Sequence, residues 1–146
     1  MSEYPSGSGS ETIVVVDDQP VVLEFCRTAL ERAGYTVFTA SNGTQALSFF
    51  EPNRSPVDLA LIDLVMPGMS GIELAGHLGK LNPRTRVVLM SGYAPDEIKR
   101  VVGTDAAQYR SMWKPFEAST LVQMIKNALD APPSEKVLDN VSRAAV

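Results

Sequence analysis

Polar side chains suited to chemistry on an anion stand at the ends of four separate apolar runs. In chain order they are Asp17 with Asp18, Asp63, Ser91 and Lys114. Short apolar runs that alternate with helix-like segments predict a parallel sheet. The carboxyl ends of parallel strands lie at one edge of a sheet, where ligands bind. We therefore expect three carboxylates, a hydroxyl and an amine to meet in one pocket.

These residue types together suit phosphoryl transfer. Neighbouring carboxylates repel unless a cation joins them, so Asp17, Asp18 and Asp63 imply a hard divalent metal. Mg²⁺ fits best, because it takes one or two carboxylates and leaves positions for phosphate oxygens. Lys114 and Ser91 would bind further oxygens of an incoming phosphoryl group. Asp63 is the expected nucleophile, because the run before it is the most apolar of the chain.

Each of these residues also has an ordinary structural explanation. An Asp after a strand commonly forms a turn or caps a helix, and that alternative stays open for either Asp17 or Asp18. Ser91 precedes Gly92 and suits a turn, while Lys114 alone suits a solvated surface. One polar residue after each of four strands is much less expected by chance.

The periodicity of the chain predicts five successive strand–helix units. Strands are expected at 12–17, 35–39, 57–62, 84–90 and 107–113, and helices at 19–33, 44–50, 71–81, 95–103 and 119–129. This order predicts an α/β fold, with a doubly wound parallel sheet and helices on both faces. The helix at 95–103 is short and weakly apolar, so we expect it to be the least firmly docked.

The 146 residues suffice for one domain, expected at 12–131. Residues 1–11 are Ser/Gly-rich and predict a flexible tail, and the tail at 132–146 is too short for an output domain. A net charge of −4 argues against a nucleic-acid partner. No apolar stretch suits a membrane span and no signal peptide is evident, so we expect a cytoplasmic protein. The single Cys26 shares a helical pattern with Val22, Phe25 and Ala29, which predicts a core residue.

Four motifs resemble those of response-regulator receiver domains of two-component signalling. They are Val-Val-Asp17-Asp18, then Asp63-Leu-Val-Met66-Pro67-Gly68-Met-Ser-Gly71, then Met90-Ser91-Gly92-Tyr93-Ala94, and finally Lys114-Pro115-Phe116. They span residues 12–130. The resemblance implies a five-stranded sheet of flavodoxin-like order 2-1-3-4-5.

The resemblance also implies roles for the residues in the motifs. Asp63 would accept a phosphoryl group from a histidine kinase or a histidine phosphotransfer protein. Mg²⁺ would be held by Asp17, Asp18, Asp63 and the backbone carbonyl of Val65. Ser91 and Lys114 would contact the phosphoryl oxygens, and the bond between Lys114 and Pro115 would be cis. Phosphorylation would repack the face formed by the helix at 95–103, the last strand and the last helix.

The chain departs from the family pattern in two places. Ser111 stands where receivers often carry an aromatic switch residue, and Tyr109 and Trp113 lie an even step away, on the same strand face. Val65 and Tyr93 occupy positions that influence dephosphorylation in the family. An apolar and an aromatic side chain there would hinder an attacking water, so we expect a long-lived phosphoryl group.

Two other functions would use a similar set of residues. The signalling receiver itself is not expected to be an enzyme in the ordinary sense. Phosphatases with an aspartyl nucleophile usually carry a second Asp two positions later, where this chain has Val65. A docking module that works without phosphorylation usually lacks an acidic residue or the lysine, and none is missing here. The Ser-Gly-Tyr-Ala stretch slightly favours a receiver from a hybrid kinase over a stand-alone one. The kinase, the downstream target and a possible homodimer stay open.

Overall fold

The computed structural model describes residues 11–52, 54, 56–92, 97 and 109–131. Over these residues the chain forms a parallel five-stranded sheet in the order β2-β1-β3-β4-β5. The elements are β1 (Thr12–Val16), α1 (Pro20–Arg32), β2 (Thr36–Ala40), α2 (Gly43–Ser48), β3 (Leu59–Asp63), α3 (Gly71–Leu81), β4 (Arg86–Ser91), β5 (Arg110–Trp113) and α5 (Ala118–Asp130). The predicted fold class and strand order are confirmed.

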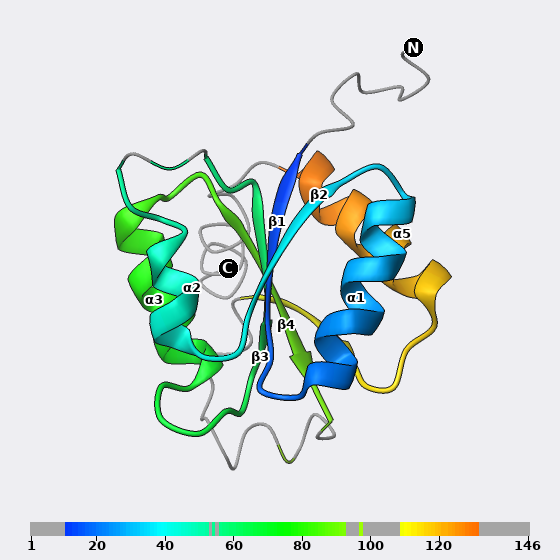
Figure 1. The fold of residues 1–146 in the computed structure, drawn as a ribbon, viewed down its shortest axis with the longest axis horizontal. Helices are drawn as coiled ribbons and strands as arrows, with labels where there is room; N and C mark the ends of the chain where they lie inside the picture. Colours follow the sequence, from blue (N-terminus) through cyan, green and yellow to red (C-terminus); the bar gives the residue numbers. More distant parts are fainter. Residues whose placement is uncertain (1–10, 53, 55, 93–96, 98–108, 132–146) are drawn as a thin grey trace, which may run out of the picture.

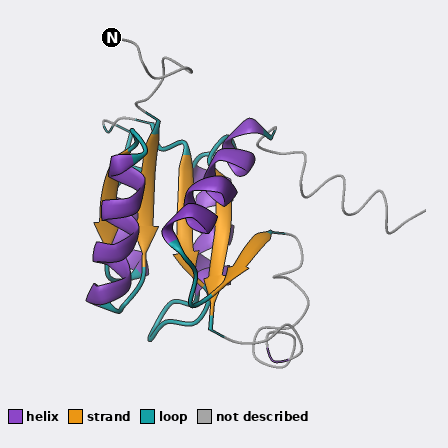
Figure 2. Ribbon diagram, turned by 90° about the vertical axis from the view of Figure 1, so that its right-hand side faces the viewer, coloured by secondary structure: helices purple, strands orange, loops and turns teal. Residues whose placement is uncertain are grey.

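The sheet lies between two helical layers. Figure 1 shows α2 and α3 on one side of the strands and α1 and α5 on the other. Figure 2 shows the strands side by side with the helices packed along them. The three inner strands β1, β3 and β4 are largely apolar on both faces, as expected for strands covered on both sides by helices. Every residue of the central strand β3 is buried.

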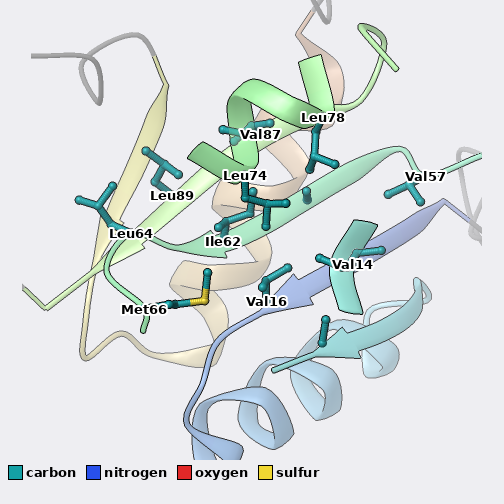
Figure 3. Close-up of a cluster of buried hydrophobic side chains, with 14 residues drawn as sticks. Val14, Val16, Val57, Ile62, Leu64, Met66, Leu74, Leu78, Val87 and Leu89 are labelled. Atoms are coloured by element: carbon teal, nitrogen blue, oxygen red, sulfur yellow. The ribbon is translucent and has the colours of Figure 1, made fainter. Parts of the chain in front are cut away.

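Strand alternation divides the core into two clusters. On one face, Leu74 and Leu78 of α3 pack toward Ile62 of β3 and its neighbours (Figure 3). On the other face, α1 and α5 cover Ile13 and Leu61 with residues such as Leu121. Burial on both faces is what fixes the strand register, because a slip by one residue would exchange the two clusters.

Cys26 belongs to the second cluster and is fully buried. Burial raises the pKa of its thiol to about 12, with a smaller contribution from the charge of Asp17. The prediction of a core cysteine is confirmed. The preceding residue, Phe25, is 40% exposed, and its ring centroid lies 6.0 Å from that of Phe116.

The helix starts follow from local hydrogen bonds. Before α3, the Ser70 hydroxyl accepts from the Glu73 N–H at 3.1 Å, and the Glu73 carboxylate accepts from the Ser70 N–H at 2.9 Å. This capping box places the first residue of α3 at Gly71, as predicted. The N-cap of α1 is Gln19, which makes no side-chain cap bond. The alternative in which Asp17 or Asp18 caps α1 is therefore wrong.

Most element bounds agree with prediction to within one or two residues. Asp63 and Ser91 are the last residues of β3 and β4, rather than the first residues of the following loops. Apart from Glu97, the predicted helix at 95–103 lies outside the described residues, as do Tyr93 and residues 132–146. The domain limits 12–131 and the tails stay predictions. Among the helices that the structure describes, none has the length and apolar character needed to cross a bilayer.

Candidate functional site

The carboxyl ends of four neighbouring strands bring the predicted residues to one edge of the sheet. Asp17 follows β1, Asp63 ends β3, Ser91 ends β4 and Lys114 follows β5. Backbone bonds fix these ends: the Asp17 N–H donates to the Ala40 carbonyl at 3.1 Å, and the Lys114 N–H donates to the Ser91 carbonyl at 2.8 Å. The parallel sheet thus supplies the convergence that the spacing predicted.

Three carboxylates form a tight acidic cluster at this edge. One oxygen from each of Asp17, Asp18 and Asp63 lies within 4.8 Å of the others. Asp17 is fully buried, Asp63 is 6% exposed, and Asp18 is exposed to solvent. Asp17 also accepts a hydrogen bond from the Gln19 N–H at 2.9 Å, which fixes its carboxylate. The buried pair and the solvent-facing third oxygen fit a hydrated hard cation such as Mg²⁺, whose preferred ligands are oxygens.

Lys114 links the cluster to the last strand. Its ammonium donates to Asp17 Oδ2 at 2.7 Å and lies 3.5 Å from Asp63 Oδ1. Burial acts to lower the pKa of Lys114, but the hydrogen bond to Asp17 and the charges of Asp63 and Asp17 outweigh it. The pKa of Lys114 is therefore raised and the side chain stays protonated. A positive charge thus lies beside the carboxylate of Asp63.

Asp63 has a strongly perturbed carboxyl group. Burial, followed by the charge of Asp17, raises its pKa from 3.8 to about 6, although Lys114 acts in the opposite direction. The group is mostly ionised at neutral pH, yet its negative charge is poorly compensated. A cation bound between the carboxylates would relieve that cost. A buried, perturbed carboxylate with a cation partner is typical of a functional site.

An apolar groove adjoins the acidic cluster. Its volume is about 480 Å³, and it is lined by Gln19, Val21, Val22, Phe25, Lys114, Pro115 and Phe116. Val21 is 80% exposed. The sequence analysis did not identify this groove. A signal was present, because Val21 and Phe25 lie four residues apart on one side of α1, next to the core-facing stripe.

The other predicted residues that the structure describes lie outside the acidic cluster. The Lys114–Pro115 bond is cis, as the resemblance implies. Val65 is half-buried against the first core cluster. Ser111 is exposed, and its hydroxyl donates to the Tyr109 carbonyl at 3.4 Å. Trp113, two residues on, is 54% exposed.

The alternation along β5 agrees with the predicted shared face. Met112 packs in the second core cluster, while Tyr109 packs against the first. Ser111 and Trp113 follow Tyr109 by even steps, so they lie on the same side of the strand as Tyr109. Tyr93 lies outside the described residues.

Comparisons with known proteins agree on one family. Residues 13–126 match the response regulator receiver domain. The sensor kinase CckA of Brucella abortus is 36% identical over 123 residues, which are 84% of this chain and 13% of that kinase. The transcriptional regulatory protein CseB of Streptomyces avermitilis is 32% identical over 117 residues, covering 80% of this chain and 48% of that protein. The chain therefore spans half or less of the length of both curated relatives.

Solved structures of two proteins match this chain over almost the whole of their own length. A CheY-like response regulator receiver domain protein from Methanospirillum hungatei is 32% identical with a TM-score of 0.72, covering 82% of this chain and 94% of that one. The response regulator TrrA of Thermotoga maritima, solved in complex with Mg²⁺ and BeF, is 32% identical with a TM-score of 0.68. That match covers 81% of this chain and 98% of TrrA.

Proposed function

The chain belongs to the response regulator receiver domain family, and from this premise we propose that it is a phosphorelay receiver whose phosphoryl acceptor is Asp63. Receiver domains are signalling modules of two-component systems rather than enzymes in the ordinary sense, and their partners are histidine kinases or phosphotransfer proteins. The donor proposed here is the phosphohistidine of such a partner, and the reaction takes place in the cytoplasm.

One observation carries this proposal. The carboxylates of Asp17, Asp18 and Asp63 converge within 4.8 Å, and the Lys114 ammonium lies 3.5 Å from Asp63. Two of the carboxylates are buried, so their mutual repulsion is costly unless a cation binds. Bound Mg²⁺, held by Asp17, Asp18, Asp63 and the Val65 carbonyl, would neutralise phosphoryl oxygens.

The step itself is a displacement at phosphorus. An Asp63 carboxylate oxygen forms the new P–O bond while the P–N bond to the donor imidazole breaks, and the electron pair of that bond stays on the imidazole nitrogen. Lys114 leaves its bond with Asp17 to bind a phosphoryl oxygen, and the Ser91 hydroxyl donates to another. Catalysis of this kind consists mostly of positioning and charge stabilisation.

The apolar groove suggests where the donor protein docks. A donor histidine must reach Asp63 from the open edge of the sheet, and Lys114 borders both the acidic cluster and the groove. A partner that covers the cluster therefore also covers Val21 and Phe25, whose exposed apolar surface would be buried. We expect Val21→Asp to weaken phosphotransfer from a protein donor and to leave labelling by acetyl phosphate unchanged.

Chemical labelling tests the acceptor directly. The protein is incubated with radiolabelled acetyl phosphate and Mg²⁺, and the covalent label is counted. We expect labelling of the wild type and of Glu51→Gln, an exposed control, no labelling of Asp63→Asn, and loss of wild-type labelling when a chelator removes Mg²⁺. Persistent labelling of folded Asp63→Asn would contradict the assignment. Absence of labelling in the wild type would instead favour a docking module that works without phosphorylation.

A further inference from the structure

The first residue of α3 lies unusually close to the acceptor strand. Gly71 is buried, and its N–H donates to the Leu64 carbonyl at 2.9 Å. A Cβ atom at Gly71 would overlap the backbone oxygen of Asp63. It would also lie 2.8 Å from the Cα of Leu64 and 3.1 Å from the carbonyl carbon of Asp63. The backbone of α3 therefore reaches a distance from β3 that a side chain would forbid.

The need for glycine here comes from space and not from backbone conformation. Among the described residues, only Gly34 and Gly68 have positive φ angles. The atoms around Gly71 belong to the backbone, so they cannot rotate away. Gly43 differs in this respect: its Cβ would lie 2.6 Å from Met69 Sδ, at the end of a flexible side chain. Gly76 and Gly79, in the same helix as Gly71, would meet nothing within 4 Å.

Leu64 connects Gly71 to the strand that ends at Asp63. The Leu64 N–H donates to the Met90 carbonyl at 2.8 Å, and the Leu64 carbonyl accepts from Gly71. The side chain of Leu64 is buried in the first core cluster. Leu64 is thus held on both sides: its N–H, in the peptide shared with Asp63, bonds to β4, and its carbonyl, in the peptide shared with Val65, bonds to the start of α3. A displacement of Leu64 shifts the Asp63 carboxylate relative to Asp17.

We infer that Gly71 is a positioning residue for phosphoryl transfer, because its missing side chain lets α3 set the place of the Asp63 carboxylate and of the Val65 carbonyl that follows. This inference rests on the proposed function for its rate effect, but its effect on the geometry of the metal site can be measured separately. Active sites are sensitive to such shifts, since a misplacement of about 1 Å can cost on the order of 100-fold in rate.

The experiment compares two variants of the full chain that differ only at position 71. The reference carries Gly76→Ala and Gly79→Ala, which meet no neighbour and favour the helix, since alanine stabilises helices relative to glycine. The test variant adds Gly71→Ala to this stabilised background. Folding is checked by circular dichroism and urea unfolding, Mg²⁺ affinity by calorimetry, and the labelling rate at saturating Mg²⁺ and acetyl phosphate.

We expect both variants to fold and the reference to match the wild type. The added Gly71→Ala should weaken Mg²⁺ binding and slow labelling at saturation by roughly 10- to 100-fold. Equal Mg²⁺ affinity and equal rate in the two variants would overturn the inference. Failure of the test variant to fold would also overturn it, because Gly71 would then serve the fold rather than the site.

The proposed function has a separate outcome in the same experiment. If the wild type and the reference take no label, phosphoryl transfer to Asp63 is refuted. The role of Gly71 is then decided by Mg²⁺ affinity alone: a weaker affinity of the test variant supports positioning of the metal site, and an unchanged affinity refutes it.

Discussion

Replacing Asp63 by asparagine should make the metal-free protein more stable. The carboxyl group is buried beside Asp17, and these two causes raise its pKa from 3.8 to about 6. Raising a pKa by one unit corresponds to about 1.4 kcal/mol. The change at Asp63 therefore corresponds to roughly 3 kcal/mol of folding free energy lost when the group ionises. Asparagine has a similar shape and no charge.

We expect a gain of about 1–3 kcal/mol at pH 7.5 in a chelator, because local relaxation reduces the full value. For a chain of this size the gain corresponds to a rise in Tm of roughly 3–10 °C. The assay is urea unfolding followed by the fluorescence of Trp113, the one tryptophan of the sequence, and by circular dichroism. Glu51→Gln is the matched control, since Glu51 is exposed and its replacement removes the same charge.

The sign of the pH dependence follows from the raised pKa. Below about pH 4, Asp63 is protonated in the folded protein and largely protonated in the unfolded chain, so it costs little. As the pH rises through about 6, the folded protein must ionise a group that resists ionisation, and the wild type loses stability relative to the variant. The difference between the two proteins should therefore be largest above pH 6.5, be small near pH 4, and vanish below the unfolded pKa of 3.8.

Two results would refute this reasoning. One is a metal-free asparagine variant no more stable than the wild type at pH 7.5. The other is a stability difference that stays the same from pH 7.5 to pH 4. Added Mg²⁺ should stabilise the wild type more than the variant, because the stabilisation of the folded state by a ligand increases with the logarithm of its affinity.

Three further predictions concern residues near Asp63. Lys114→Met should destabilise the metal-free protein by roughly 3 kcal/mol in urea unfolding, because the buried Asp17 carboxylate loses its partner; an unchanged midpoint would contradict the pairing. Ser70→Ala should lower the free energy of unfolding by about 1 kcal/mol in the same assay, since it breaks the capping box with Glu73. If the Ser70→Ala, Glu73→Ala double variant loses no more stability than the single variant, the two residues are coupled. The phosphoryl label on the wild type should persist for minutes or longer without a phosphatase, and Val65→Asn should shorten its life by admitting water; loss within seconds from the wild type would disprove the expected shielding.

The sequence predicted the strands and their carboxyl ends because those features are local. The apolar run before Asp63 ends where the polar residue begins, and β3 ends at that same residue. The strand order required the family resemblance, since alternating strands and helices allow more than one doubly wound order. Even so, the class of fold and the convergence of Asp17, Asp63 and Lys114 followed from pattern alone.

Details of the site that depend on tertiary distance were not predictable in this way. The bond between Lys114 and Asp17 joins residues 97 positions apart, and nothing local to either residue indicates it. The helical pattern around Cys26 includes Phe25 but does not indicate that Phe25 lines a groove with Phe116, as it does in the structure. Gly71 was predicted only as the start of a helix, because its closeness to Asp63 arises from how α3 sits on the sheet.

The rate at which a reagent modifies Cys26 would report how often the second core cluster opens. Its thiol is fully buried between α1, to which it belongs, and the rest of the second core cluster. Its pKa of about 12 keeps it protonated, so a thiol reagent at neutral pH cannot modify it in the closed protein. Modification must wait until the α1 face separates from the sheet. α1 starts beside the acidic cluster. The rate of Cys26 modification with and without Mg²⁺ would therefore show how far a ligand at the sheet edge slows the separation of α1 from the sheet.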